Sequence, residues 1–261
     1  MWSPSWGKKG DDNDANCDIE RILGAATTWL SCTRSVLRHL ALALSTLSTQ
    51  NMCLDVVYEF EAPMRRVYLA NFTKCSLIVP ESRIIADLLV QGIEGSDWDK
   101  HVLDLNVLQK RTVKTAATYA VLARSRLQTM SRGLWELVRD GSAPEATHAV
   151  LAATVKFSPL FGDFMRTVVR DQFRRFGTHL DARCWDAYIE DSMRSQPSMP
   201  TLSDSTRVKL RQNAMRMLAE AGFIESTRSL RLRSQQIEPA VLNYLRQHNE
   251  QYVLDCLQVC P

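Results

Sequence analysis

Apolar residues recur every three or four positions over a long stretch near the middle of the chain. They step through positions 105, 108, 112, 116, 119, 123, 127, 130 and 134, and all of these except Thr112 are apolar or aromatic. Such spacing places side chains on one face of an α-helix, because the helix repeats every 3.6 residues. The pattern predicts one amphipathic helix of about eight turns across residues 105–134.

The polar face of this predicted helix is basic. The segment Asn106–Arg132 has six Lys or Arg side chains and no Asp or Glu. The arc opposite the apolar stripe carries Lys110, Lys114, Arg124 and Arg132. A solvated helix face normally mixes charge signs, because oppositely charged pairs four residues apart stabilise a helix. The segment therefore indicates an external anion as its partner, with an idle basic surface as the alternative.

Further helices are predicted from the same periodicity and from the positions of proline and glycine. Proline at the start and glycine after the end of an apolar segment are typical of helix boundaries. These signals place helices at Glu81–Gln91, Asp99–Leu105, Leu134–Arg139, Ala143–Val155, Pro159–Phe176, Asp181–Met193 and Ser203–Ala221, and after Pro239. Ser203 is expected to cap its helix, and Gly222 to end it in a left-handed conformation. The expected fold class is all-α.

Two short strands are predicted after Gly222. Phe223 and Ile224 form an apolar pair, and residues 228–233 read Arg-Ser-Leu-Arg-Leu-Arg, in which polar and apolar side chains alternate from Ser229 on. A period of two is typical of a β-strand, so the two segments are expected to pair as a hairpin. A helix, a hairpin with a basic turn and a final helix form the tail of a winged helix-turn-helix. We therefore expect a helical bundle followed by a small winged-helix-like lobe.

This lobe holds a second set of candidate DNA contacts. The side of its first helix that faces away from the apolar stripe, and the hairpin, carry Lys209, Gln212, Arg216, Arg228, Arg231 and Arg233. Gln can pair with adenine and Arg with guanine in the major groove, and arginines also bind phosphates without reading sequence. The alternative interpretation is that these groups only keep a helical domain in solution.

The chain is expected to have several parts. They are an N-terminal extension at 1–63, a helical bundle at 64–195, the winged-helix-like lobe at 200–248 and a C-terminal tail at 249–261. Gln196–Pro200 has two prolines in five residues and suits a linker. The extension is predicted to be poorly ordered or to lie outside the native product, with Met64 as the natural start. The alternative is a genuine N-terminal helix, Ile19–Leu47, that packs on the rest.

Composition is that of an ordinary soluble protein. Hydrophobic residues make up 45% of the 261 and charged residues 23%, with a net charge of +3. The charge is uneven, since residues 1–63 sum to −3 and residues 64–261 to +6. The seven cysteines are scattered without a C-x-x-C pair, which is typical of reduced thiols in the cytoplasm. No charge-free apolar run reaches the length of a membrane-spanning helix, so no membrane is expected.

Motifs of catalysis and cofactor binding are missing from the sequence. It has no phosphate-binding G-x-x-x-x-G-K-S/T loop, no dinucleotide-binding G-x-G-x-x-G and no G-x-S-x-G elbow. The five histidines are isolated, and none forms a metal-binding pair at helical spacing. We therefore expect no catalytic residues, no metal and no cofactor.

A set of short segments occurs in a defined order from Arg66 to the C-terminus. They are Ile85–Leu89 with Trp98 and Asn106, Arg124–Leu127, Lys156–Leu160 before Asp163 and Phe164, Trp185, and Leu218–Ile224. The ordered set resembles the BrxA family, small helical components of BREX bacteriophage-exclusion systems. The resemblance implies a cytoplasmic, non-catalytic, DNA-binding protein that works beside a methyltransferase, an ATPase and other defence proteins.

The charge pattern and the resemblance together predict a function. We expect a non-catalytic protein that binds duplex DNA mainly through backbone phosphates, within a bacterial anti-phage system. One alternative is an adaptor that docks the larger defence enzymes through apolar faces. Another is an RNA-binding helical bundle.

Overall fold

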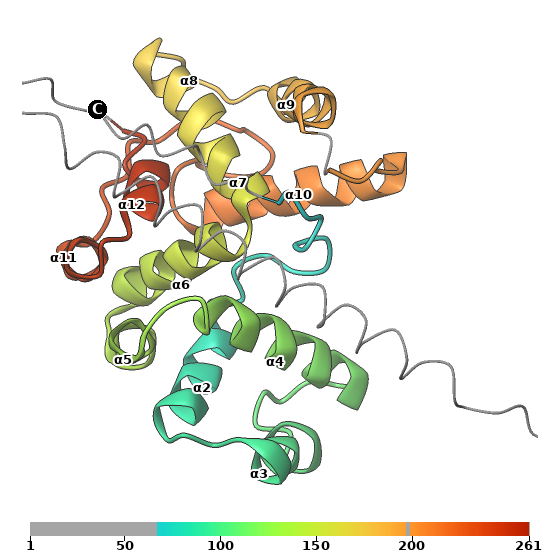
Figure 1. Cartoon of the computed structure of the whole chain (residues 1–261). Coiled ribbons are helices and arrows are strands. Elements are labelled where there is room, and N and C mark those ends of the chain that lie inside the picture. Colours follow the sequence, from blue (N-terminus) through green and yellow to red (C-terminus); the bar gives the residue numbers. More distant parts are fainter. Residues whose placement is uncertain (1–66, 197–198, 261) are drawn as a thin grey trace, which may run out of the picture. The chain divides into compact units, whose positions relative to one another are not determined.

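The computed structural model describes residues 67–196 and 199–260, all within the compact unit Pro63–Pro261 (Figure 1). These residues are mostly helical and include no β-strand. The α-helices are α2 (Val79–Val90), α3 (Gly95–Asp99), α4 (Val113–Leu127), α5 (Arg132–Asp140), α6 (Ala143–Phe157), α7 (Pro159–Phe164), α8 (Arg170–Arg174), α9 (Ala182–Ser195), α10 (Asp204–Glu220), α11 (Pro239–Gln247) and α12 (Gln251–Leu257). The π-helical turns are η1 (Lys100–Asp104) and η2 (Met165–Val169). The expected helical fold class is confirmed, whereas the expectations for residues 1–63 lie outside the described residues.

The start and stop signals read from the sequence are found at the helix ends. Proline lies in the first turn of α2, α6, α7 and α11, where its missing N–H removes no helical hydrogen bond. Ser203 caps α10, because its hydroxyl oxygen accepts a hydrogen bond from the Thr206 amide at 3.3 Å. Gly222 follows α10 at φ 84°, in the left-handed region that favours glycine. These predicted boundaries are confirmed.

Helix α6 is the centre of the fold. Every residue from Ala149 to Val155 is buried, and the helix contacts α2, α4, α5, α7, α11 and α12. In Figure 1, α2, α4 and α5 lie below α6, and α7 and α12 lie above it. A helix that is buried on all sides is typical of the middle of a large helical core.

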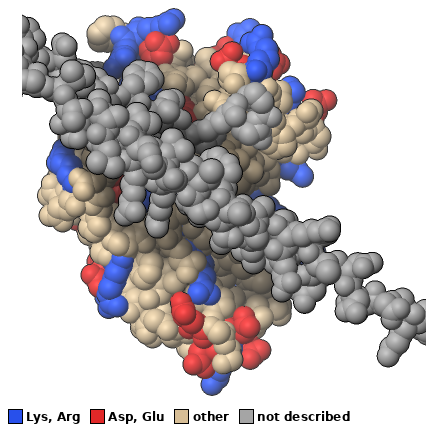
Figure 2. Space-filling view, in the orientation of Figure 1, with Lys and Arg blue, Asp and Glu red and all other residues tan. Residues whose placement is uncertain are grey.

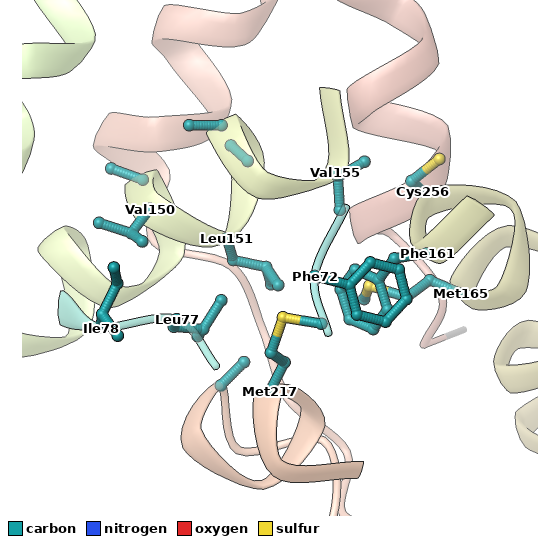
Figure 3. Packing of buried hydrophobic residues seen from close by; sticks show 14 of the residues in the cluster. Phe72, Leu77, Ile78, Val150, Leu151, Val155, Phe161, Met165, Met217 and Cys256 are labelled. Carbon is teal, nitrogen blue, oxygen red and sulfur yellow. The ribbon is translucent and has the colours of Figure 1, made fainter. Parts of the chain in front are cut away.

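Large apolar side chains from distant segments pack around α6. Figure 3 shows Phe72 and Leu77 from the chain before α2 close to Leu151 of α6 and Met217 of α10. All four side chains are almost completely buried. Residues that are far apart in the sequence therefore share one core, and this core fixes the position of α10.

Helices α7 and α8 form one continuous helix through η2, as predicted for Pro159–Phe176. An aromatic cluster joins it to α9, where the Trp185 and Phe164 ring centroids lie 4.7 Å apart. The Tyr68 hydroxyl donates a hydrogen bond to the buried Asp163 carboxylate at 2.7 Å. These contacts attach the start of the described chain and α9 to the same helix.

The single long helix predicted across residues 105–134 is wrong. Residues 105–112 are irregular, α4 begins only at Val113, and a turn separates α4 from α5. Much of the apolar stripe is nonetheless buried, including Leu108 and Ala123. The apolar spacing therefore identifies residues that face the core, although these residues come from several segments and not from one helix.

Polar side chains explain why the helix begins late. Asn106, at φ 45°, bonds the Lys110 amide and carbonyl through its side chain, at 3.0 and 2.8 Å. Thr112 then caps α4 by accepting a hydrogen bond from the Thr115 amide at 3.2 Å. Asn and Thr side chains thus form hydrogen bonds that compete with those of the helical backbone. The spacing of apolar residues contains no information about this competition.

The predicted β-hairpin is present only as isolated bridges, without strands in the described part of the chain. Ile224 pairs antiparallel with Leu232, and Arg231 pairs antiparallel with His179. The pairing stays short because Leu230, at φ 48°, interrupts the extended backbone just before the bridged residues. The winged-helix lobe is therefore not confirmed, and the division between a bundle and a lobe stays a prediction.

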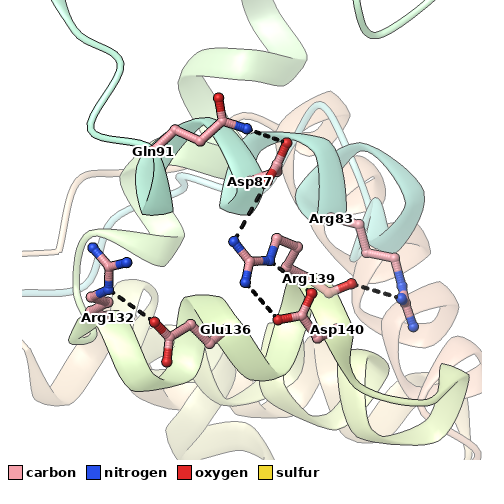
Figure 4. A network of polar contacts seen from close by, with 7 residues as sticks. All are labelled: Arg83, Asp87, Gln91, Arg132, Glu136, Arg139 and Asp140. Atoms are coloured by element: carbon pink, nitrogen blue, oxygen red, sulfur yellow. Dashed lines mark hydrogen bonds and ion pairs between the residues drawn. The ribbon is translucent and has the colours of Figure 1, made fainter.

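A polar network fastens α2 to α5. Arg83 of α2 donates hydrogen bonds to the carbonyls of Arg139 at 3.1 Å and Gly141 at 2.6 Å (Figure 4). The Arg139 guanidinium pairs with Asp140 at 2.7 Å and with Asp87 of α2 at 3.6 Å. The last carbonyls of a helix have no hydrogen-bond partner within the helix. A cation at this end therefore satisfies them and interacts favourably with the negative end of the helix dipole.

Candidate nucleic-acid interface

Lys110 lies just before α4 and is held against α2. Its ammonium group forms an ion pair with Glu81 and lies 4.7 Å from the centroid of the Tyr119 ring. The Lys110 side chain is 24% exposed and the Glu81 side chain 14%. The contact joins the irregular segment to α2 and leaves little of this cation open to a ligand.

Arg124 has a comparable environment farther along α4. Its guanidinium lies 3.5 Å from Glu94 and 4.4 Å from the centroid of the Trp98 ring. The negative electrostatic potential of an aromatic face stabilises a cation in this position. With a side-chain exposure of 26%, Arg124 belongs mainly to the packing of α3 on α4.

Arg132 and Lys114 are more open. Arg132 is 63% exposed and pairs with Glu136, one turn along α5, at 2.9 Å (Figure 4). Lys114 is exposed, and no carboxylate of a described residue lies within 4.0 Å of it. The premise of an unpaired basic face is therefore wrong, because Glu81, Glu94 and Glu136 supply carboxylates from outside the acid-free segment.

A further base of the same segment, Arg126, is buried in the core. Its guanidinium donates hydrogen bonds to the carbonyls of Ser76 at 2.7 Å and Leu77 at 3.3 Å. Burial lowers the pKa of Arg126 to about 10. Arg126 links α4 to the chain before α2, a structural role that the count of charges along the sequence did not reveal.

Helix α10 has the two faces that the sequence predicts. Its exposed side carries Lys209, Gln212 and Arg216. Leu210 and Met217, on the opposite side, are fully buried. The ion pairs that α10 makes with described residues come from other arginines, which face α9. Lys209 and Arg216 have no such partner in the described chain, so both cations are open to a ligand.

The bridged turn after α10 is also basic and open. Arg228, Arg231 and Arg233 are exposed, and none has a carboxylate within 4.0 Å among the residues that the structure describes. Leu230 and Leu232 alternate with them and pack against the core. The alternation turns the arginines toward solvent.

A pocket of about 550 Å³ brings α10 and this turn together. Its lining includes Gln212, Arg216, Thr227, Leu230 and Ala182, the last at the start of α9. None of the four candidate cations from residues 105–134 lines it. The predicted contacts therefore fall into two sets. Of the set on α10 and the turn, Gln212 and Arg216 line this pocket.

Acidic side chains weaken the case for DNA binding by the four candidate cations of residues 105–134. Figure 2 shows them gathered over α3, the helix that packs against Arg124. Asp97 and Asp99 of this helix are exposed, as is Glu94 just before it. A DNA phosphate that approached Arg124 would meet these carboxylates, so the region is a poor site for a polyanion.

Metal binding and membrane insertion can be examined in the same described residues. Within them, no group of three or more His, Cys, Asp or Glu side chains is placed to hold a metal ion. None of their helices is both long enough and apolar enough to cross a lipid bilayer.

Comparison with known proteins identifies the family. The BrxA family model matches residues 66–249, which include α2 through α11. The chain is 46% identical over 193 residues to a BREX protein BrxA of Paramagnetospirillum magneticum, covering 74% of this chain and 96% of that protein. It is 30% identical over 193 residues to a BREX protein BrxA of Escherichia coli, covering 74% and 91%. A crystal structure of an uncharacterized protein from Magnetospirillum magneticum matches with a TM-score of 0.70 and 44% identity, covering 74% of this chain and 100% of the other. The chain therefore belongs to the BrxA family of BREX phage-defence proteins.

Proposed function

We propose that this protein is a non-catalytic component of a BREX system that binds duplex DNA, mainly through backbone phosphates. The observation that carries the proposal is the set of exposed cations on α10 and the bridged turn, of which Arg216 lines the pocket between these two elements. Phosphate contacts gain free energy because condensed counterions are released from DNA. Cations without a carboxylate partner give up no ion pair when they make such contacts. Lys114 is a further candidate, whereas Lys110 and Arg124 rank low because they are largely covered.

The order of elements around the pocket supports a winged-helix-like use of α10. The continuous helix α7–α8 precedes α9 and α10, and short bridged segments lie at 178–180, 223–225 and 230–232. Backbone hydrogen bonds of 2.8–2.9 Å join the last segment to the other two. In helix-turn-helix proteins the second helix of the pair enters the major groove. We assign this role to α10 and the role of the wing to residues 226–229.

This assignment moves part of the expected bundle into the DNA-binding lobe. Helix α9 and residues 178–180 lie in the range 64–195 that was expected for the bundle. Helix α9 nevertheless borders the pocket through Ala182, and residues 178–180 pair with residues 230–232. Gln212 and Arg216 are then placed to meet base edges, and the turn arginines to meet phosphates. Such a role belongs in the cytoplasm, where cysteines without disulfide bonds, such as those described here, are ordinary.

The test is binding to a fluorescently labelled duplex at salt concentrations from about 50 to 200 mM. We expect the logarithm of the association constant to fall linearly with the logarithm of salt concentration, because phosphate contacts dominate. A competitor RNA duplex of the same sequence distinguishes DNA binding from the RNA alternative. Absence of binding, or binding that salt does not weaken, would contradict the proposal.

An adaptor role is the second candidate, and a separate pocket favours it. This pocket of about 490 Å³ has a mainly apolar lining that includes Ala70, Val121, Leu122 and Phe157. Val121 is 60% exposed, as is Val113 at 61% on the same helix. An adaptor would retain a purified defence enzyme at high salt, and Val121→Asp would abolish that retention without changing DNA affinity.

A further inference from the structure

Val208 is an apolar side chain on a face of α10 that is otherwise polar. It is 40% exposed, and it is the one residue of α10 among the exposed large apolar side chains of the described residues. Its exposed neighbours on the helix include Lys209, Gln212 and Arg216. Valine has a lower helix propensity than Lys, Gln or Arg, so its presence here does not favour the helix. Single exposed valines are common on protein surfaces, so the surroundings decide whether this one has a function.

Contacts on the other sides of α10 determine which residues face outward. The Arg211 guanidinium pairs with the Asp186 carboxylate of α9 at 2.5 Å. The side-chain amide of Asn213 donates a hydrogen bond to the Phe72 carbonyl at 2.8 Å. These contacts fix the rotation of the helix about its own axis. The outward side chains, Val208 among them, are therefore held in a defined arrangement before any ligand binds.

The outward face of α10 is free of acidic side chains over most of its length. The acids of the helix, Asp204 and Glu220, lie at its two ends. The Glu220 carboxylate also accepts a hydrogen bond from the Leu77 amide at 2.9 Å. The exposed residues between the two acids are Ser205, Val208, Lys209, Gln212 and Arg216. DNA can therefore approach this stretch without meeting a carboxylate of α10.

Val208 and Gln212 lie in the part of α10 that meets bases if the helix enters the major groove. In helix-turn-helix proteins the N-terminal residues of the second helix contact base edges. Val208 is the fifth residue of α10 and Gln212 is the ninth. They are separated by one helical turn, about 6 Å along the axis, whereas stacked base pairs are about 3.4 Å apart. The two side chains can therefore reach neighbouring base pairs.

The chemistry of the two side chains suits A·T base pairs. The thymine C5-methyl group is the apolar group that bases present in the major groove, and the methyl groups of a valine can pack against it. Guanine and cytosine present no such group, so contact with Val208 favours thymine over both. The Gln212 amide can donate to adenine N7 and accept from the adenine amino group.

We propose that α10 reads A·T base pairs, with Val208 against a thymine methyl group and Gln212 on an adenine of a neighbouring pair. The inference rests on the proposed function, because it requires α10 to enter the major groove, and it adds the bases that the protein prefers. Phosphate contacts supply most of the affinity for every duplex. Val208 and Gln212 supply the additional affinity for a site that contains A·T pairs.

The test begins with selection from a duplex library that has a randomised central segment. The full-length chain is used at about 150 mM salt, which weakens binding through phosphates alone. We expect the selected duplexes to share a site with A·T pairs at neighbouring positions. Each thymine of this site is then replaced by deoxyuridine, which pairs with adenine but lacks the C5-methyl group. Loss of the contacted methyl group should weaken binding about fourfold, the factor expected for one buried carbon.

A variant of each residue assigns the contacts. Val208→Ala should bind the thymine and deoxyuridine duplexes equally well, because the methyl group has lost its partner. The salt dependence should stay the same, since no charge is removed. The matched control is Val113→Ala on α4, where the valine is 61% exposed, and it should retain the fourfold preference for thymine. Replacement of adenine by 7-deazaadenine, which lacks N7, should weaken binding of the unmodified chain and leave that of Gln212→Ala unchanged.

The outcomes distinguish this inference from the proposed function. Salt-dependent binding without a selected site, or equal affinity for thymine and deoxyuridine at every position, would overturn the inference and leave the proposed function standing. A preference for thymine that persists in Val208→Ala, or is lost in Val113→Ala as well, would overturn the role of Val208. Absence of binding to any duplex would overturn both.

Discussion

The arginines of the bridged turn offer the sharpest test of DNA binding. We consider a variant in which Arg228, Arg231 and Arg233 are all changed to Ala. All three side chains are exposed and lack a carboxylate partner among the described residues. Their removal should change the free energy of unfolding by no more than about 0.5 kcal/mol, as is usual for surface substitutions.

The expected loss of affinity follows from counterion release. Each phosphate contact on duplex DNA contributes about 0.9 to the slope of log affinity against log salt. Loss of three contacts should therefore reduce that slope by up to about 2.7, and affinity at physiological salt by roughly 100-fold. The effect should be the same for every duplex sequence, because phosphates carry no sequence information.

The assay is fluorescence anisotropy of a labelled duplex across a salt series, with thermal unfolding as a check on the fold. The matched control changes the exposed residues Lys100, Arg194 and Arg246 to Ala. Both triple variants lower the formal net charge from +3 to 0, since each removes three positive charges. An unchanged slope in the turn variant, or an equal loss in the control, would refute local phosphate contacts at the turn.

Three further predictions concern stability and are measured by chemical denaturation. Lys110→Gln should lower the free energy of unfolding by about 1 kcal/mol, because its half-buried ion pair and ring contact are lost. Lys114→Gln should leave the free energy of unfolding unchanged. Equal effects of the two substitutions would contradict the conclusion that Lys110 is paired and Lys114 is open. Phe176→Gly should raise the free energy of unfolding by about 1 kcal/mol, because glycine adopts the left-handed conformation of this position without strain. A decrease would show that the Phe176 ring packs against the protein in solution. Burial, followed by the hydrogen bond to Asp163, raises the pKa of Tyr68 from 10.0 to about 12. The contribution of Tyr68 is therefore complete below about pH 10 and is lost as the pH rises toward 12. Tyr68→Phe should flatten the loss of stability between about pH 10 and 12, and an equal fall in both proteins would refute this.

Helix boundaries could be predicted from the sequence because their signals are local. Ser203, Gly222 and the prolines that open four helices act within one turn of the backbone they affect. Helix α12 was not predicted, although Val253, Cys256 and Leu257 are buried at helical spacing. That segment has only 7 residues, which is too short for periodicity to stand out from a tail.

The bridged segment at 178–180 could not be predicted from the sequence. Thr178 and His179 follow shortly after α8, without the alternation that marks a strand. Their partners, Arg231 and Leu232, lie about fifty residues later and are brought near by the aromatic packing of α9 on α7. Such pairing depends on tertiary structure, so the candidate DNA-binding site could be recognised only in part.

The two sets of candidate cations show why charge must be counted by spatial neighbourhood. The acid-free segment suggested free cations, yet Lys110 and Arg124 are paired with Glu81 and Glu94, which lie about thirty residues earlier. The turn contains an acid, Glu225, but Arg228, Arg231 and Arg233 are exposed and have no carboxylate partner among the described residues, whereas Leu230 and Leu232 are partly buried against the core. A phosphate gains most from a cation that is both exposed and unpaired, since no existing ion pair has to be broken. The search for DNA contacts therefore belongs first at α10 and the turn, although the basic segment around α4 has the stronger signal in the sequence.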